Sequence, residues 1–284
     1  MPWLKAAVCN PNPNGTLMGL FHNRPTVADI RAIKGKRQMT MLYVETPDEA
    51  AAAAAAGIDM LSIIAPFWTA EMRAAAGECF VQVGLLYGEL VTQEDYQRAA
   101  HRAMQRGGDC VYCASSLGTI KALADDGIPV VSHVGLIPSK ATWTGGFKAV
   151  GKTAQSAMQI FQQVAQLENV GCFGVELEVV PDRVAQELSK RTHLVLLGMG
   201  AGPHADAQYL FAEDVLGQTN GHRPRHAKTY RNFRAELDRL QQERIAAFRE
   251  FKADVDNGSY PGLAHQVTIS DAEFNDLIGR LDAI

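Results

Sequence analysis

A chain of 284 residues is long enough for one large α/β domain, and an apolar content of 47% supports a substantial buried core. A formal net charge of −4 argues against a nucleic acid or an anionic membrane surface as the partner. No run of about 18 apolar residues is present, and residues 1–5 lack the features of a signal peptide. We therefore expect a cytoplasmic protein without membrane spans.

The chain alternates between strand-like and helix-like segments. Residues 1–23 contain a turn-forming run of Asn, Pro and Gly and predict an irregular N-terminal arm, and a short helix is expected over 26–34. The predicted strands cover 39–44, 60–65, 79–85, 110–115, 129–136, 172–180, 193–198 and 208–212. Eight strand–helix units in about 220 residues fit a closed α/β barrel, the (β/α)8 TIM barrel. A doubly wound open sheet is the alternative.

The C-terminal part of the sequence is helical and charged. A long helix is predicted over 229–254, and a short helix is predicted from about residue 271. We divide the chain into an N-terminal arm (1–23), a single barrel domain (24–257) and a C-terminal helical tail (258–284).

The sixth predicted strand carries two acids, Glu176 and Glu178, before Pro181 opens the next helix. Side chains alternate along a strand, so both carboxylates point to the same face. A buried acid is costly unless it is paired or used, and Glu178 lies near the strand end at which parallel barrels hold their active sites. The pair predicts one wall of an active site, and the alternative is a structural acid hydrogen-bonded to a neighbouring strand.

Motifs in the second half of the chain carry a resemblance to a known family. The clearest are Ser132-His133-Val134-Gly135-Leu136-Ile137-Pro138, Gly145-Gly146-Phe147-Lys148-Ala149-Val150-Gly151 and Leu177-Glu178-Val179-Val180-Pro181. They resemble the ketopantoate hydroxymethyltransferase family, which belongs to the phosphoenolpyruvate mutase and isocitrate lyase group of barrels. The resemblance covers about residues 24–266 and is strongest after residue 129.

The resemblance implies a reaction. In that family a divalent metal ion chelates the carboxylate and keto oxygen of a 2-oxo acid, and a glutamate removes a proton from the carbon beside the ketone. The enolate then attacks a one-carbon unit carried by methylenetetrahydrofolate. The match implies that Glu178 is the base, that His133 binds a small carboxylate substrate, and that methylenetetrahydrofolate is a candidate co-substrate. It also implies a homo-oligomer, for which a decamer is one candidate.

This chain departs from the family at the metal site. The family has ligand aspartates at the ends of its second and third strands, where this chain has Ala65 and Gly84. Magnesium requires oxygen ligands, usually including carboxylates. We therefore expect no family-type magnesium site and no tightly bound cofactor. A lysine and a glutamate of the family's fourth strand are replaced by Tyr112 and Ala114.

Other side chains on the same barrel face are candidates to replace the metal. The candidates for substrate binding are His133, Tyr112, Gln82 and Lys148, and Glu176 is a second candidate catalytic acid beside Glu178. A protonated His133 suits a carboxylate, and the Tyr112 hydroxyl suits an oxyanion. Two acids on one face tend to share a proton, which raises one pKa. The alternative is a relocated transition metal held by Glu176, Glu178 and His133.

We therefore predict a hydroxymethyltransferase-like enzyme that acts on a 2-oxo acid or related carboxylate by general-base enolisation and one-carbon transfer. The alternatives are a metal-independent carbon–carbon lyase or hydrolase, and a non-catalytic binder of small molecules. Glu45 is a spare acid candidate. His226 lies beside Arg225 in a basic segment, which predicts a surface or interface position, with a lid contact as the alternative.

Overall fold

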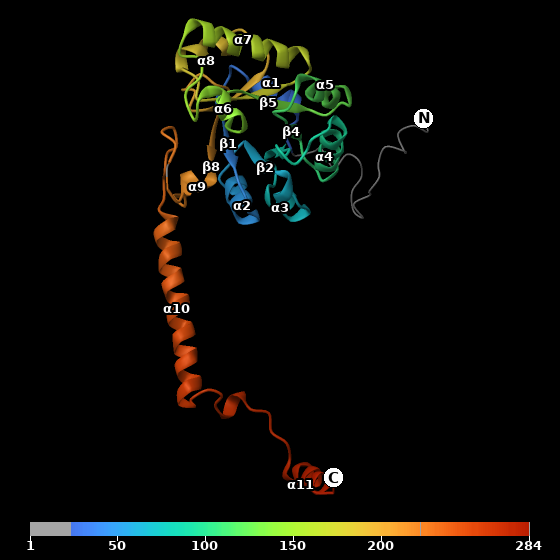
Figure 1. The fold of residues 1–284 in the computed structure, drawn as a ribbon, viewed down its shortest axis with the longest axis vertical. Coiled ribbons are helices and arrows are strands. Elements are labelled where there is room, and N and C mark those ends of the chain that lie inside the picture. The colour runs from blue at the N-terminus through green and yellow to red at the C-terminus, as the bar shows by residue number, and fades with distance from the viewer. Residues whose placement is uncertain (1–23, 222, 284) are drawn as a thin grey trace, which may run out of the picture. The chain divides into compact units, whose positions relative to one another are not determined.

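The computed structural model describes residues 24–221 and 223–283, so the predicted arm over 1–23 lies outside the described residues. Within the described ranges, eight parallel strands close into a barrel in sequence order (Figure 1). The strands are β1 Met39–Tyr43, β2 Met60–Ile64, β3 Phe80–Gly84, β4 Cys110–Tyr112, β5 Val130–Gly135, β6 Gly174–Glu178, β7 Val195–Met199 and β8 Ala207–Phe211. This topology confirms the (β/α)8 TIM barrel and excludes the doubly wound sheet.

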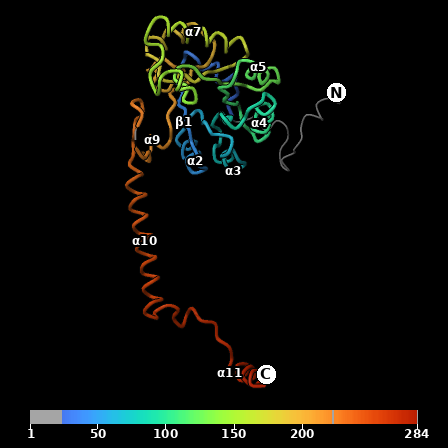
Figure 2. Tube along the Cα trace, viewed as in Figure 1, coloured from blue at the N-terminus to red at the C-terminus, as the bar shows by residue number. Residues whose placement is uncertain are grey.

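Five of the helices in the described barrel that follow strands begin at a Ser or Thr side-chain cap. Thr46, Thr69, Thr92, Ser116 and Thr153 each accept a hydrogen bond from the backbone amide three residues later. The helices of the barrel are α1 Val27–Ile33, α2 Pro47–Ala55, α3 Ala70–Ala75, α4 Gln93–Gln105, α5 Leu117–Asp125, α6 Ala141–Thr144, α7 Ala154–Asn169, α8 Asp182–Ser189 and α9 Ala212–Leu216. Helices α2, α3, α4, α5 and α7 follow one another around the strands (Figure 2). Short 3-10 turns occur at Ala65–Phe67 and Pro138–Lys140.

Strand alternation divides the buried side chains into two apolar clusters. One cluster lies between strands and helices and includes Leu61, Val81 and Leu177. The other comes from the opposite strand faces and includes Met60, Phe80, Cys110, Val131 and Val195, which fill the barrel interior.

The same inward faces become polar two residues further along the strands. Met60 is followed by Ser62, Phe80 by Gln82 and Val131 by His133, and all three polar side chains are buried. The interior is therefore apolar where these strands begin and polar toward their C-terminal ends, where barrel enzymes place their chemistry.

The described chain forms two units, one ending at Tyr230 and the other beginning at Arg231. The second unit contains α10 (Phe233–Asn257), a 3-10 turn (Leu263–His265) and α11 (Asp271–Leu281), and neither helix has a buried residue. These helices confirm the two predicted C-terminal helices. In the part of the chain that the structure describes, no helix combines the length and apolar character needed to cross a membrane.

Candidate active site

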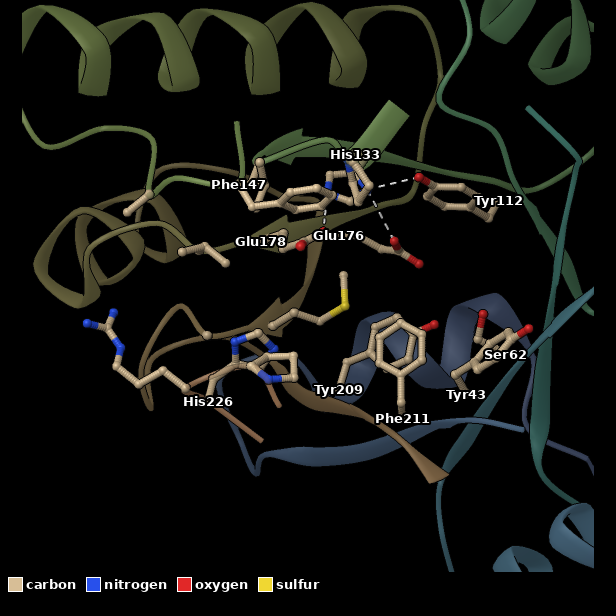
Figure 3. A pocket seen from close by; sticks show the side chains of 18 of the residues that line it. Tyr43, Ser62, Tyr112, His133, Phe147, Glu176, Glu178, Tyr209, Phe211 and His226 are labelled. Carbon is tan, nitrogen blue, oxygen red and sulfur yellow. Dashed lines mark hydrogen bonds and ion pairs between the residues drawn. The ribbon is translucent and has the colours of Figure 1, made fainter. Parts of the chain in front are cut away.

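A cavity of about 1170 Å³ lies where the inward strand faces become polar. Its lining comes from the C-terminal ends of the strands, from the loop over 137–152 and from residues 224–226. Figure 3 shows His133, Glu176, Glu178 and Tyr112 on one side of the cavity, and Tyr209, Phe211 and His226 on the other. The position fits a barrel active site.

The strand register brings His133 between the two acids of β6. His133 pairs with Glu176 across β5 and β6, and Gly135 pairs with Glu178. His133 Nδ1 lies 3.3 Å from Glu176 Oε2, and His133 Nε2 lies 3.2 Å from Glu178 Oε2. The imidazole is 2% exposed, and the side chains of Glu176 and Glu178 are 7% and 14% exposed. A buried ring therefore contacts one carboxylate at each nitrogen.

Three further polar side chains surround this group. The Tyr112 hydroxyl forms a hydrogen bond with His133 Nδ1 at 2.9 Å. The Gln82 amide donates to Glu176 Oε1 at 2.8 Å and to Ser62 Oγ at 3.2 Å. Glu176, predicted as a second catalytic acid, is thus held from two sides, which suits a residue that positions His133.

Burial and charge act in opposite directions on His133. Burial lowers its pKa, but the adjacent carboxylates of Glu176 and Glu178 outweigh burial and raise the pKa to about 9. The ring is therefore an imidazolium at neutral pH. Burial, followed by the charge of Glu176, raises the pKa of Tyr112 well above its ordinary value, so the phenol keeps its proton.

The sequence predicted that Glu176 and Glu178 share a proton, and this stays a prediction. The two carboxylates contact opposite nitrogens of one cation, which offsets their mutual repulsion.

Two buried polar atoms in this group have no hydrogen-bond partner among the described residues: His133 Nε2 and Gln82 Oε1. The Nε2 contact with Glu178 is an ion pair by distance but lacks hydrogen-bond geometry. A buried donor without a partner costs about 1–3 kcal/mol, so such atoms mark places where a ligand can bind. His133 also lines the cavity, so a ligand oxygen that displaces the Glu178 carboxylate could satisfy Nε2.

The backbone around Glu178 is fixed on both sides. The Leu136 amide donates to the Glu178 carbonyl at 2.9 Å, and the Val179 amide donates to the Met199 carbonyl at 2.8 Å. Val179 has a φ of +50°, which is a strained conformation for a β-branched residue. Gly135, with a φ of +90°, leaves room for the Glu178 carbonyl, from which a Cβ atom at position 135 would be only 2.2 Å away.

The family's metal position contains no oxygen ligand in this chain. Strand pairing places Ile64 opposite Gly84, and both line the cavity. Ala65, which the sequence comparison placed at a ligand position, begins a 3-10 turn and does not line the cavity. Neither Ile64 nor Gly84 offers a side-chain ligand, so the residues present do not fit the family's magnesium ion.

The relocated metal has no support in the described part of the chain. There, no group of three His, Cys, Asp or Glu side chains is arranged to hold a metal ion. His133 is instead engaged with Tyr112 and the two carboxylates. The absence of a functional metal stays a prediction.

The mouth of the cavity contains residues that the sequence only partly identified. Lys148 lines it from the loop over 137–152, as predicted, but is exposed and lies outside the His133 group. Glu45 also lines it and accepts a hydrogen bond from the Tyr43 hydroxyl at 3.0 Å. Phe211 packs against Tyr43 and Tyr209, with ring centroids 5.0 and 5.8 Å apart. This aromatic wall was not predicted, and period-two alternation in β8 was the only signal for it.

His226 is partly buried and lines the cavity, which agrees with the lid contact that the sequence left as the alternative to a surface or interface position. The sequence contained no direct signal for this, because the residue follows β8 in a segment without regular structure. Arg225 and Lys152 are exposed at the same mouth.

Comparisons with known proteins agree with the architecture and motifs. A family model described as ketopantoate hydroxymethyltransferase matches residues 64–263. A 3-methyl-2-oxobutanoate hydroxymethyltransferase of Thermus thermophilus is 33% identical over 266 residues, which cover 85% of this chain and 99% of the relative.

Solved structures are similar at lower identity. A protein from Burkholderia cenocepacia described as a phosphonomutase shares 13% identity with a TM-score of 0.50, over 62% of this chain and 84% of its own. The 2,3-dimethylmalate lyase of the phosphoenolpyruvate mutase/isocitrate lyase superfamily shares 13% identity with a TM-score of 0.48, over 90% of this chain and 99% of its own.

Proposed function

The chain belongs to the ketopantoate hydroxymethyltransferase family, and from this premise we propose that it acts on a 2-oxo acid or a related carboxylate. In this proposal it transfers a one-carbon unit to the carbon beside the keto group, with methylenetetrahydrofolate as co-substrate. The observation that carries the proposal is the buried imidazolium of His133 beside Glu178, with an unpartnered nitrogen at the cavity.

Glu178 is the general base. Its carboxylate takes the proton from the carbon next to the ketone, the C–H electron pair forms the enolate double bond, and the keto π pair moves to oxygen. Glu178 Oε2 and His133 Nε2 are 3.2 Å apart, so one group can meet the carbon while the other meets the keto oxygen.

His133 stabilises the enolate oxygen, a role that the metal ion has in the family. Its Nε2–H donates to the developing oxyanion, and the positive charge is already present in the free enzyme. A preorganised donor of this kind is worth about 10²–10³ in rate. Glu176, Tyr112 and Gln82 hold the imidazolium, and Lys148 neutralises the substrate carboxylate at the mouth.

The test is hydrogen exchange. The protein is incubated in D2O with 3-methyl-2-oxobutanoate and a metal chelator, and loss of the C3 proton is followed by NMR. We expect exchange without added metal. Glu178→Gln should slow it by about 10²–10⁴-fold because the base is lost, while Glu71→Gln on exposed α3 serves as the matched control.

Two results would reject parts of this proposal. Exchange that appears only after magnesium is added would reject the role of His133 as the replacement for the metal. Absence of exchange across a panel of branched and linear 2-oxo acids would reject enolisation itself, and would favour a non-catalytic binder.

A carbon–carbon lyase or hydrolase of the same family is the second candidate, because the cavity has lost the acids that hold the family's metal ion. The two candidate functions differ in whether they need a folate that carries the one-carbon unit. Turnover that requires methylenetetrahydrofolate supports transfer, whereas cleavage of a hydroxylated 2-oxo acid with no added folate supports a lyase.

A further inference from the structure

We propose that His226 is a second catalytic residue. It donates a proton to the oxygen of the one-carbon unit when the carbon–carbon bond forms, and accepts that proton when the bond breaks. This inference rests on the proposed function, since it concerns the step after enolisation. It assigns a different residue to each of two proton transfers at opposite sides of one cavity.

His226 faces Glu178 across the cavity. Figure 3 shows its ring on the side opposite to His133 and Glu178. The segment that carries it is held by backbone hydrogen bonds from Ala227 to Pro224 at 2.9 Å and from Tyr230 to Val215 at 2.8 Å. The ring is therefore presented by an anchored segment at the position where a second reactant would approach the enolate.

The His226 ring occupies the space that a side chain at position 200 would need. A Cβ atom at position 200 would lie 2.7 Å from His226 Nδ1 and 3.0 Å from its Cγ, and Gly200 has a φ of +65°. Only glycine combines that conformation with that space. No hydrogen bond joins the His226 ring to another residue of the described chain, so its nitrogens are available to a ligand.

The surroundings of His226 give it the opposite protonation state from His133. Burial lowers the pKa of His226, the charges of Glu178 and Asp214 raise it, and that of Arg225 lowers it, with a net decrease. His226 is thus a neutral imidazole at neutral pH and can accept a proton. Titratable groups whose environments push their pKa values apart are the usual mark of an acid–base pair.

Protons and electron pairs balance in both directions of the step. In the direction of cleavage, neutral His226 takes the proton of the hydroxymethyl group, the oxygen pair forms the C=O bond of formaldehyde, and the carbon–carbon pair returns to the enolate. In the direction of synthesis, water first hydrolyses methylenetetrahydrofolate to formaldehyde and tetrahydrofolate. The enolate carbon then bonds to the formaldehyde carbon, the C=O π pair moves to oxygen, and protonated His226 supplies the proton.

Two assays separate this role from enolisation. The first is C3 hydrogen exchange of 3-methyl-2-oxobutanoate, and the second is cleavage of its hydroxymethylated product with tetrahydrofolate present. We expect His226→Asn and His226→Phe to keep exchange within about twofold and to lose cleavage by about 10²-fold or more. His101→Asn on exposed α4 is the control and should change neither rate.

Gly200→Ala provides a second variant that keeps the histidine but displaces its ring. It should reproduce the selective loss of cleavage, because the new methyl group would lie 2.7 Å from Nδ1 and push the ring aside. Cleavage retained in His226→Phe would overturn the inference, and so would an equal loss of both activities. No exchange in the unaltered protein would overturn the proposed function itself.

Discussion

At the floor of the cavity, one imidazole ring contacts a carboxylate at each nitrogen and a phenol at Nδ1. Removing one partner from a buried ion pair typically costs about 3–5 kcal/mol, because the other charge stays behind unpaired. Substitution of His133 or of either carboxylate partner should therefore destabilise the protein. In our proposal the buried cation stabilises an enolate, and it also contributes to folding, so stability and activity should depend on the same proton.

Stability should fall at alkaline pH because of His133. Its folded pKa of about 9 is above the ordinary value of 6.5, so its contribution is fully present below about pH 6.5 and is lost as pH rises through 9. At about 1.4 kcal/mol per pKa unit, the loss is about 3 kcal/mol. Urea unfolding at pH 6.5 and pH 9.5 measures it. His133→Gln should lack this loss, and an equal loss in that variant would contradict the assignment.

Glu176→Gln should lower the pKa of His133, because one of the two carboxylates that raise it is removed. The alkaline limit of C3 hydrogen exchange should therefore move to lower pH by about one unit or more, while Glu178 remains as the base. The pH–rate profile is the measurement, with Glu71→Gln as the matched control. An unchanged alkaline limit would mean that another group sets it.

At the scale of elements, strand alternation was readable from the sequence, but contacts between strands were not. The pattern predicted that Glu176 and Glu178 share a face, and the structure confirms that both meet His133. The pairing of Ile64 with Gly84 depends on the register between β2 and β3, which the sequence pattern does not specify. His226 follows the barrel strands in an irregular segment, so no periodicity indicated its direction.

The junction of β5 and β6 should be the least tolerant element of the site. In Gly135→Ala, the new methyl group would lie 2.2 Å from the Glu178 carbonyl oxygen. The strand ends must separate, which should cost about 3 kcal/mol or more and displace Glu178. The free energy of unfolding and the exchange rate measure the two effects.

Gly57→Ala is the matched control for that substitution. Gly57 also has a positive φ of +75°, but a Cβ atom there would meet nothing within 4 Å. Gly57→Ala should lower the free energy of unfolding only by the cost of a Cβ atom at positive φ, about 1–2 kcal/mol. It should keep the full rate of C3 hydrogen exchange. Equal destabilisation of the two variants would show that backbone strain, and not the β5–β6 contact, dominates at position 135.

At the scale of the whole molecule, the second unit has a row of exposed apolar side chains on one face of α10, which we call the α10 stripe. On α10, the exposed residues Phe233, Leu237, Leu240, Phe248, Phe251 and Val255 recur at spacings of three, four and eight residues. This spacing places them on one helix face. The family resemblance implies a homo-oligomer, and we propose that a second copy of this chain covers the α10 stripe.

Placing charges on the α10 stripe should therefore reduce the size of the assembly. The double variant Leu240→Glu, Phe251→Glu puts two carboxylates on an exposed face, so the barrel should stay folded while association weakens because those charges would be desolvated in an interface. Light scattering after size exclusion measures the mass, and circular dichroism monitors the fold. Gln242→Glu, on the opposite face of α10, is the control and should keep the mass of the unaltered protein. A monomeric unaltered protein, or an assembly that the double variant leaves intact, would contradict the proposal.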